Sequence, residues 1–344
     1  MSEEQHTIAA NEGSALALGL GFHLATGKLP LIYLQNSGMG NLVNPILSLT
    51  DQDVYSIPGI LMIGWRGEPG IPDEPQHVTQ GKITLKLLEL MNVPYKVFDT
   101  EMTEDSVEKE LVNSIKLSIQ ENKMNALVIK KGFFDDYQYL SEESNFSLSR
   151  ERAINVILNE SEEGDIFVST TGLASRELYD LREKFGHSHS KDFMVVGGMG
   201  HANQIALGIA MHQKKRRIIC LDGDGAVIMH MGSLTSVGRS KQTNLLHVVL
   251  NNGAHDSVGG QKTSALDVNL KEIAKQCGYE NVFSVAKEED LLRDLKFISN
   301  LKGPIFLEVK VKKGWRKEIG RPATSPEENK NNFMSNLSKQ NDHD

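Results

Sequence analysis

The chain is poor in the features that mark secreted, membrane-spanning and nucleic-acid-binding proteins. It has only 2 cysteines, Cys220 and Cys277, and their spacing fits neither a disulfide framework nor a zinc site. No apolar stretch approaches the roughly 18 residues of a membrane helix, and the polar start at residues 1–6 is no signal peptide. A net charge of -8 without a basic tract argues against nucleic acid or an anionic membrane as a partner. We therefore expect a soluble, cytoplasmic protein.

Two common phosphate-binding motifs are also missing. No Gly-x-x-x-x-Gly-Lys-Ser/Thr loop occurs in the chain. A dinucleotide fingerprint needs a third glycine, but the pair Gly223 and Gly225 is followed by Ile228 at that position. The pair at 198 and 200 is followed by Asn203. Any site for a phosphorylated ligand must be built differently.

Short apolar runs alternate with helix-like segments in both halves of the chain. The 344 residues leave room for roughly two domains of about 150 residues each, and 39% hydrophobic residues suffice for their cores. This alternation predicts an α/β protein with two parallel sheets covered by helices on both faces. The expected strands are Leu31–Leu34, Gly59–Ile63, Tyr95–Asp99, Ala126–Ile129, Ile166–Ser169, Phe193–Val196, Ile218–Leu221, Leu246–Leu250 and Ile305–Val309.

Composition suggests where the domains begin and end. Residues 135–147 are polar and acidic without a clear period, so we interpret them as a linker. A first domain then covers residues 1–134 and a second covers 148–321, the second opening on a helix from about 148 to 159. Residues 322–344 are rich in Asn, Ser, Lys and Glu and predict a short C-terminal helix with a frayed tail.

Two polar loops follow apolar runs of the second half. Gly-Asp-Gly at 223–225 comes after the run 217–221, and Asn-Asn-Gly at 251–253 comes after the run 245–250. One crossover with a helix at about 232–241 connects them, so both loops should lie at one edge of a parallel sheet. Either motif alone would predict only a turn. Together they predict a hard-metal site beside a cradle of backbone N–H groups for a diphosphate.

This arrangement resembles the thiamine diphosphate motif, in which Gly-Asp-Gly and a downstream Asn-Asn close on a magnesium ion that holds the diphosphate. The resemblance implies that Asp224, the side chain of Asn252 and the backbone carbonyl of Ala254 bind Mg²⁺. Two other segments agree with it. Asn-Glu-Gly at 11–13 resembles the glutamate segment of a pyrimidine-binding domain, and residues 197–202 resemble the segment that shapes the bent cofactor.

Narrower similarities point to one family among these enzymes. The segments that carry them are 64–70, 73–77, 170–172, 175–178 and 310–322. With these segments, the chain from about Ile8 to Phe333 resembles the phosphonopyruvate decarboxylases and the related sulfopyruvate decarboxylases. The resemblance implies a pyrimidine-binding first domain, a diphosphate-binding second domain, and decarboxylation of 3-phosphonopyruvate to phosphonoacetaldehyde.

The family's cofactor residues carry over to matching positions. Glu12 matches the glutamate that promotes proton removal from the cofactor; an acid near a helix N-terminus is also favourable in any protein. Met199 matches the residue that wedges between the two cofactor rings, and Gly197 the one whose carbonyl accepts from the amino group, although a methionine there could equally fill a core. The expected cofactor-binding set is Gly197, Met199, Gly200, His201, Gly223, Asp224, Gly225, Ala226, Asn252 and Ala254.

The expected substrate needs cationic partners. A 2-oxo acid that also carries a phosphonate has about three negative charges, which favours arginine and histidine in its pocket. His77 is the expected proton shuttle and a catalytic candidate beside Glu12. Arginines near glycine and proline turns also hold loop carbonyls, and a histidine after the metal loop could simply orient it. The substrate candidates are Arg66, His255, Arg316 and Arg321, with His77 and His201.

The N-terminus departs from the family pattern. Relatives carry a strand, a loop and a helix before the segment that matches Ile8, so the first sheet is expected to lack an inner strand. The resemblance implies a homodimer or larger homo-oligomer with active sites at subunit interfaces. Three functions remain open: a phosphonopyruvate decarboxylase, a sulfopyruvate or other 2-oxo acid decarboxylase or carboligase, and a non-catalytic cofactor-binding partner subunit.

Overall fold

A computed structural model describes residues 6–136 and 144–339 of the chain, which divides into two compact units at residues 1–138 and 139–344. Most of the predicted linker at 135–147 therefore lies outside the described residues, as does the end of the predicted tail beyond residue 339. Among the described residues, no helix is both long enough and apolar enough to span a bilayer.

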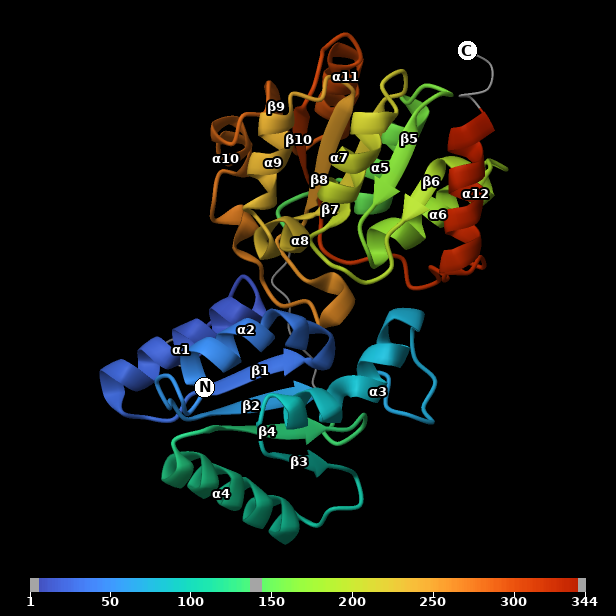
Figure 1. Cartoon of the computed structure of the whole chain (residues 1–344). Coiled ribbons are helices and arrows are strands. Elements are labelled where there is room, and N and C mark those ends of the chain that lie inside the picture. The colour runs from blue at the N-terminus through green and yellow to red at the C-terminus, as the bar shows by residue number, and fades with distance from the viewer. Residues whose placement is uncertain (1–5, 137–143, 340–344) are drawn as a thin grey trace. The chain divides into compact units, whose positions relative to one another are not determined.

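The first unit is built on a four-stranded parallel sheet in the order β1-β2-β4-β3 (Figure 1). Strand β1 is one of the two edge strands, and its residues alternate between exposed and buried, with Leu31 and Tyr33 facing out. Strand β4, by contrast, is buried along its whole length, as expected for an inner strand of a parallel sheet. The strands are β1 (Leu31–Gln35), β2 (Gly59–Gly64), β3 (Tyr95–Phe98) and β4 (Met124–Ile129).

Helices cover both faces of this sheet. One core contains residues of α1 and α3 with the inward side chains of β1, β2 and β4. The other contains Val107 and Ile115 of α4 packed against Ile60, Phe98 and Leu127. The helical elements of this unit are α1 (Glu12–Thr26), the 3₁₀ helix η2 (Asn36–Asn41), α2 (Val43–Pro45), the π turn η3 (Ile46–Thr50), α3 (Pro75–Leu90) and α4 (Glu104–Glu121).

The second unit is built on a six-stranded parallel sheet in the order β6-β5-β7-β8-β10-β9. Successive residues of β7 enter opposite cores: Ile219 and Leu221 face one, whereas Ile218 and Cys220 face the other. Burial on both faces explains why this strand is a continuous apolar run. The strands are β5 (Ile166–Ser169), β6 (Asp192–Met194), β7 (Ile218–Gly223), β8 (Leu245–Asn251), β9 (Asn281–Val285) and β10 (Ile305–Lys310).

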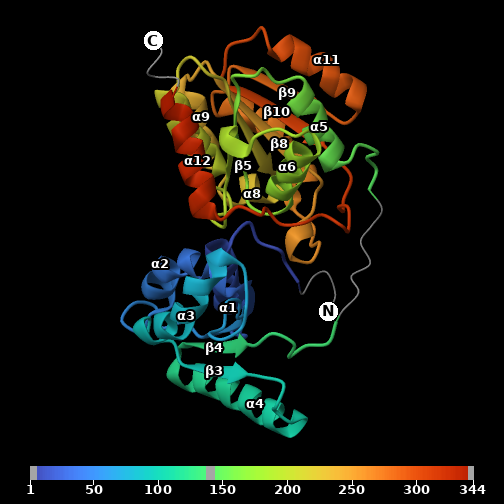
Figure 2. The ribbon, with the colours of Figure 1, turned by 90° about the vertical axis from the view of Figure 1, so that its right-hand side faces the viewer.

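Helices of the second unit also form two layers, which Figure 2 shows on either side of the sheet. Helices α5, α6 and α11 pack on one face, and α7, α9, α10 and α12 pack on the other. The elements are α5 (Arg150–Asn159), α6 (Leu173–Lys184), η4 (His189–Lys191), α7 (Ala202–His212), α8 (Asp224–Met229), α9 (Ser233–Ser240), η5 (Asp256–Val258), η6 (Ser264–Leu266), α10 (Leu270–Gln276), α11 (Glu288–Ile298) and α12 (Pro326–Lys339).

The predicted fold class is confirmed, and each predicted strand has a counterpart in one of the two sheets. Two elements were not predicted. Strand β9 was missed, and Asp224, which was predicted in a loop, is the first residue of the short helix α8. The predicted crossover is present, because β7 and β8 pair in parallel with Gly223 opposite Leu250.

Candidate active site

The two motif loops lie side by side in the second unit. Since β7 and β8 are hydrogen-bonded neighbours, the residues that follow them, Asp224 and Asn252, leave the same edge of the sheet. The backbone N–H of Asn252 also donates to the Asp224 carboxylate and stabilises its charged form. The side chain of one loop thus contacts the backbone of the other.

Asp224 is a buried carboxylate with one strong side-chain partner. The hydroxyl of Thr263 donates to its Oδ2 at 2.5 Å, and the side chain is almost fully enclosed. Burial raises the pKa of Asp224 to about 6, because the hydrogen bonds from Thr263, Gly225 and Asn252 offset only part of the lost hydration. A cation beside this oxygen would replace much of that lost stabilisation.

Asn252 has its amide held in one orientation. Its Nδ2 donates to Oδ2 of Asp256 at 2.6 Å, and its Oδ1 accepts from the backbone N–H of Ala254 at 3.2 Å. The amide oxygen is therefore turned toward the loop that follows. Carboxylate, amide and backbone carbonyl oxygens are the hard ligands that Mg²⁺ prefers, so Asp224, Asn252 and Ala254 fit the ion.

Gly225 is the point where three predicted segments meet. A Cβ at this position would lie 2.5 Å from Cε1 of His255 and 3.3 Å from Cε of Met199. Only glycine leaves room for both side chains. Met199 and His255, which are 56 positions apart in the sequence, therefore approach the Gly-Asp-Gly turn together. Burial lowers the pKa of His255, so its ring favours the neutral form.

The Gly-rich segment at 197–200, which precedes α7, packs against residues that follow the Gly-Asp-Gly turn. Gly200 has φ +87°, and a Cβ there would lie 2.9 Å from the carbonyl oxygen of Ala226. His201 stacks on His230 with ring centroids 4.6 Å apart. The backbone N–H of Gly197 donates to Oγ1 of Thr171 at 3.1 Å. This segment thus approaches α8 directly at Ala226, and the loop after β5 holds its other end.

Glu12 belongs to the first unit, at the start of α1. The residue before it, Asn11, caps the helix by accepting from the backbone N–H of Ser14. Nδ2 of Asn41 donates to Oε2 of Glu12 at 2.7 Å. A Cβ on Gly38 would lie only 2.0 Å from Oε1 of Glu12. The 3₁₀ helix η2 therefore closes around this carboxylate.

Arg66 and His77 also lie in the first unit, and their charges interact. Arg66 makes a two-point ion pair with Asp73, with Nε at 2.8 Å from Oδ2 and Nη2 at 2.5 Å from Oδ1. This pairing holds the pKa of Asp73 well below its usual range. Burial and then the nearby Arg66 charge lower the pKa of His77. Asp73 thus already engages one predicted substrate cation.

The remaining two substrate candidates lie after β10. The guanidinium of Arg316 is turned toward carboxylates of α5 and α6: its Nη2 is 2.5 Å from Oδ2 of Asp180, and its Nε is 3.4 Å from Oε2 of Glu151. Arg321 is exposed in the segment before α12. The ion-pair partners of Arg316 are thus carboxylates of α5 and α6, whereas Asp256 and Thr263 contact the predicted metal-binding residues directly.

The sequence patterns did not predict the two residues that contact the predicted metal ligands. Thr263 binds Asp224, and Asp256 binds Asn252, but neither stands in a local pattern that marks it. The loop between them is folded back, because Ala254 and Lys262 form an antiparallel bridge. This folding brings Thr263 to Asp224 from 39 positions away in the sequence, so no local sequence pattern could reveal the contact.

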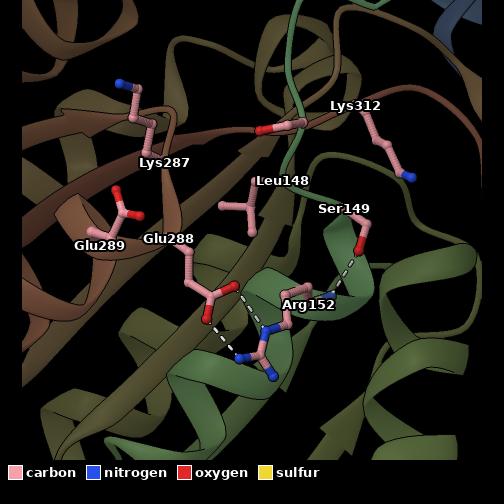
Figure 3. A pocket seen from close by; sticks show the side chains of 8 residues that line it. Leu148, Ser149, Arg152, Lys287, Glu288, Glu289 and Lys312 are labelled. Atoms are coloured by element: carbon pink, nitrogen blue, oxygen red, sulfur yellow. Dashed lines mark hydrogen bonds and ion pairs between the residues drawn. The ribbon is translucent and has the colours of Figure 1, made fainter.

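A separate hollow of the second unit contains none of the predicted site residues (Figure 3). It is open and polar, and its Arg152 is paired with Glu288 through contacts of 2.8 and 2.6 Å. It offers no prepared site for a cofactor. Its lining residues are Ser147, Leu148, Ser149, Arg152, Lys287, Glu288, Glu289 and Lys312.

The chain resembles known proteins over nearly its whole length. Residues 171–309 match the family described as thiamine pyrophosphate enzyme, C-terminal TPP binding domain. A phosphonopyruvate decarboxylase of Streptomyces viridochromogenes is 33% identical over 338 residues, covering 94% of this chain and 83% of that protein. One of Streptomyces hygroscopicus is 32% identical over 341 residues, covering 94% and 82%.

A third relative is named for a different substrate. The sulfopyruvate decarboxylase of Methanosarcina acetivorans is 27% identical over 351 residues, covering 95% of this chain and 86% of that protein. The higher identities with both Streptomyces proteins, and the matched cofactor-binding domain, decide the assignment. The chain belongs to the phosphonopyruvate decarboxylase family of thiamine diphosphate-dependent decarboxylases.

Proposed function

We propose that this chain decarboxylates 3-phosphonopyruvate to phosphonoacetaldehyde and carbon dioxide with thiamine diphosphate and Mg²⁺. The observation that carries the proposal is the meeting of Asp224, Asn252 and Met199 around Gly225, in a chain 33% identical to a phosphonopyruvate decarboxylase. The reaction is not oxidative, so it needs no electron acceptor.

In this proposal the second unit holds the diphosphate end of the cofactor. Asp224, the Asn252 amide oxygen and the Ala254 carbonyl hold Mg²⁺, while the glycines at 223 and 225 let backbone N–H groups approach the anion. When bound, thiamine diphosphate supplies a nucleophilic thiazolium carbon and takes up the electron pair released with carbon dioxide. Met199 packs beside the rings and excludes water from them.

The first unit supplies the groups that hold and move protons. Glu12, which accepts from Asn41, holds a proton against the aminopyrimidine of the cofactor. His77 accepts a proton as a neutral base, because burial lowers its pKa and keeps the ring uncharged near pH 7. Arg66 binds an anionic end of the substrate, and Asp73 fixes the plane of its guanidinium.

We also propose that the active form is a homodimer or a larger homo-oligomer. Helix α1, which begins at Glu12, exposes large apolar side chains: Leu18 is 52% exposed, Phe22 44% and Leu24 72%. Leu18 and Phe22, four residues apart, share one face of the helix, and exposed apolar side chains of this size favour burial in an interface. Light scattering of the purified chain measures its oligomeric state, and a fully active monomer would exclude the proposed oligomer.

The test of the function is release of carbon dioxide from 3-phosphonopyruvate with added thiamine diphosphate and Mg²⁺, with sulfopyruvate run beside it. We expect the phosphonate to be the better substrate. Faster turnover of sulfopyruvate would identify the chain as a sulfopyruvate decarboxylase. Turnover of neither substrate would identify it as a non-catalytic cofactor-binding subunit. Glu12→Gln should retain the cofactor and lose turnover, whereas Asp224→Ala should lose Mg²⁺-dependent cofactor binding.

A further inference from the structure

Asp256 joins three separate parts of the second unit through one oxygen atom. Its Oδ2 accepts from Nδ2 of Asn252 at 2.6 Å, from the backbone N–H of Gly314 at 2.9 Å, and from Nη1 of Arg150 at 3.4 Å. The carboxylate itself is buried, with 7% of its side chain exposed. A buried carboxylate with three donors is rigidly held.

Arg150 is fixed in turn by a second carboxylate. Its Nε and Nη2 donate to the two oxygens of Glu177 at 2.8 and 3.0 Å, and both side chains are buried. Removing one member of such a group leaves an uncompensated buried charge, so its members hold one another in place. The chain of contacts runs from Glu177 through Arg150 and Asp256 to Asn252.

This chain of contacts determines which end of the Asn252 amide faces Asp256. The two ends of the asparagine side chain are nearly equal in shape, but only the oxygen can bind a cation. A carboxylate only accepts hydrogen bonds, so the amide group 2.6 Å from Asp256 must be the NH₂. The oxygen is then left facing the loop of Ala254.

We infer that Asp256 is a positioning residue that, held by Arg150 and Glu177, keeps the amide oxygen of Asn252 turned toward Mg²⁺. The inference rests on the proposed magnesium site and deepens it. Partners behind a metal ligand usually change metal affinity by about 10–100-fold when they are removed.

The first test titrates Mn²⁺, followed by its electron paramagnetic resonance signal, and Mg²⁺, followed by calorimetry, into the full-length chain with thiamine diphosphate. Asp256→Ala should weaken both affinities by about 10–100-fold. The matched control is Asp192→Ala, because the Arg182–Asp192 pair in the same unit is equally buried, with contacts of 2.9 and 2.8 Å. The control should lose stability and keep its metal affinity. Equal metal affinity in wild type and Asp256→Ala would overturn the inference.

The decisive test is a rescue that a merely structural role for Asp256 would not give. Asn252→Asp places a symmetric carboxylate at 252, which needs no orienting. In the Asp256→Ala background it should restore most of the Mn²⁺ affinity. In the wild-type background it should weaken binding, because two carboxylates would lie 2.6 Å apart. A double variant that binds no better than Asp256→Ala overturns the inference.

Two further variants keep the outcomes distinct. Should Asp256→Ala fail to fold, Asp256→Asn preserves the shape and holds the neighbouring NH₂ less strongly, so it should lose affinity several-fold and respond to the same rescue. Asp224→Ala separates the two proposals. If it retains Mg²⁺ binding, the proposed metal site itself is wrong. If it loses binding while the Asp256 variants do not, only the positioning role fails.

Discussion

At the scale of single residues, Asp224 shows that a residue proposed as a metal ligand can oppose folding. The carboxylate is nearly fully buried, and its pKa rises from the ordinary 3.8 to about 6. Above pH 6 the folded chain holds a charge that the unfolded chain would hydrate better. This group therefore lowers stability near neutrality, and its effect fades as the pH falls through about 6 toward 3.8.

Asp224→Asn should consequently stabilise the chain in the absence of cofactor and metal. A shift of this size corresponds to at most about 3 kcal/mol, so we expect a gain of roughly 1–3 kcal/mol at pH 7.5. The gain should shrink at pH 5, where the wild-type carboxyl takes up its proton. Denaturant unfolding at both pH values measures it. A less stable variant at pH 7.5 would contradict the account.

A second prediction at this scale concerns the hydrogen-bonded chain behind the Gly-Asp-Gly turn. Nδ1 of His247 lies 2.9 Å from the hydroxyl of Tyr279, and Nε2 lies 3.3 Å from Oδ2 of Asp222. Asp222 in turn accepts from the backbone N–H of Gly223 at 2.9 Å. Cys220, Asp222 and His247 lie close enough together to bind a metal ion, but both ring nitrogens of His247 already have hydrogen-bond partners.

Tyr279→Phe removes one end of that chain and leaves a buried ring nitrogen without its partner. We expect a loss of about 1–3 kcal/mol in unfolding free energy. Tyr95→Phe is the control, because the Tyr95 hydroxyl bonds Glu89 at the surface, 2.9 Å away, and its loss should change stability by less than about 0.5 kcal/mol. Equal effects of the two substitutions would argue against the buried chain.

At the scale of elements, the short helix η2 determines where the Glu12 carboxylate lies. Gly38→Ala would bring a Cβ to 2.0 Å from Oε1 and 2.6 Å from Cγ of Glu12. The flexible acidic side chain must move, so we expect turnover to fall by roughly 10²-fold while the fold persists. Gly40→Ala in the same helix is the control, since its Cβ meets nothing within 4 Å. The measurement is the turnover of 3-phosphonopyruvate by both variants and the wild type.

The elements also show which structure the sequence alone predicts. Strands buried on both faces, such as β7 and β8, are mostly apolar, and their predicted bounds lie within two residues of the observed ones. Strand β9 was missed because it is a half-exposed edge strand whose sequence contains Asn and Ser. The Gly-Asp-Gly and Asn-Asn motifs are local and could be found. Thr263 could not, because the folding of its loop brings it to Asp224 from 39 positions away in the sequence. Asp256 could not, because an acidic residue four positions after Asn252 belongs to no motif.

At the scale of the whole molecule, the candidate groups divide between the two units. Glu12, Arg66 and His77 belong to the first, whereas Asp224 and Asn252 belong to the second. The structure describes each unit by itself. The proposed homo-oligomer predicts that one active site combines Glu12 of one subunit with Asp224 of another.

Mixing two inactive variants tests whether one active site combines residues of two subunits. If each site combines Glu12 of one subunit with Asp224 of another, a re-associated mixture of Glu12→Gln and Asp224→Ala should regain about one quarter of wild-type turnover, because half of the dimers carry one intact site. Each variant alone, taken through the same dissociation and re-association, is the control. No recovery from a mixture shown to contain hybrid dimers would mean that each chain completes its own site.

The position of Arg150 bears on how the second unit can be produced separately. Similarity to the cofactor-binding family begins at residue 171, which is after both Arg150 and strand β5. Strand β5 lies between β6 and β7, and Arg150 supports Asp256 from the first turn of α5. A recombinant fragment that begins at residue 171 would lack β5 and expose the middle of the sheet to solvent. It would also lack Arg150, which contacts the Asp256 carboxylate. Expression of this unit should begin upstream of Ser149, the residue that caps α5.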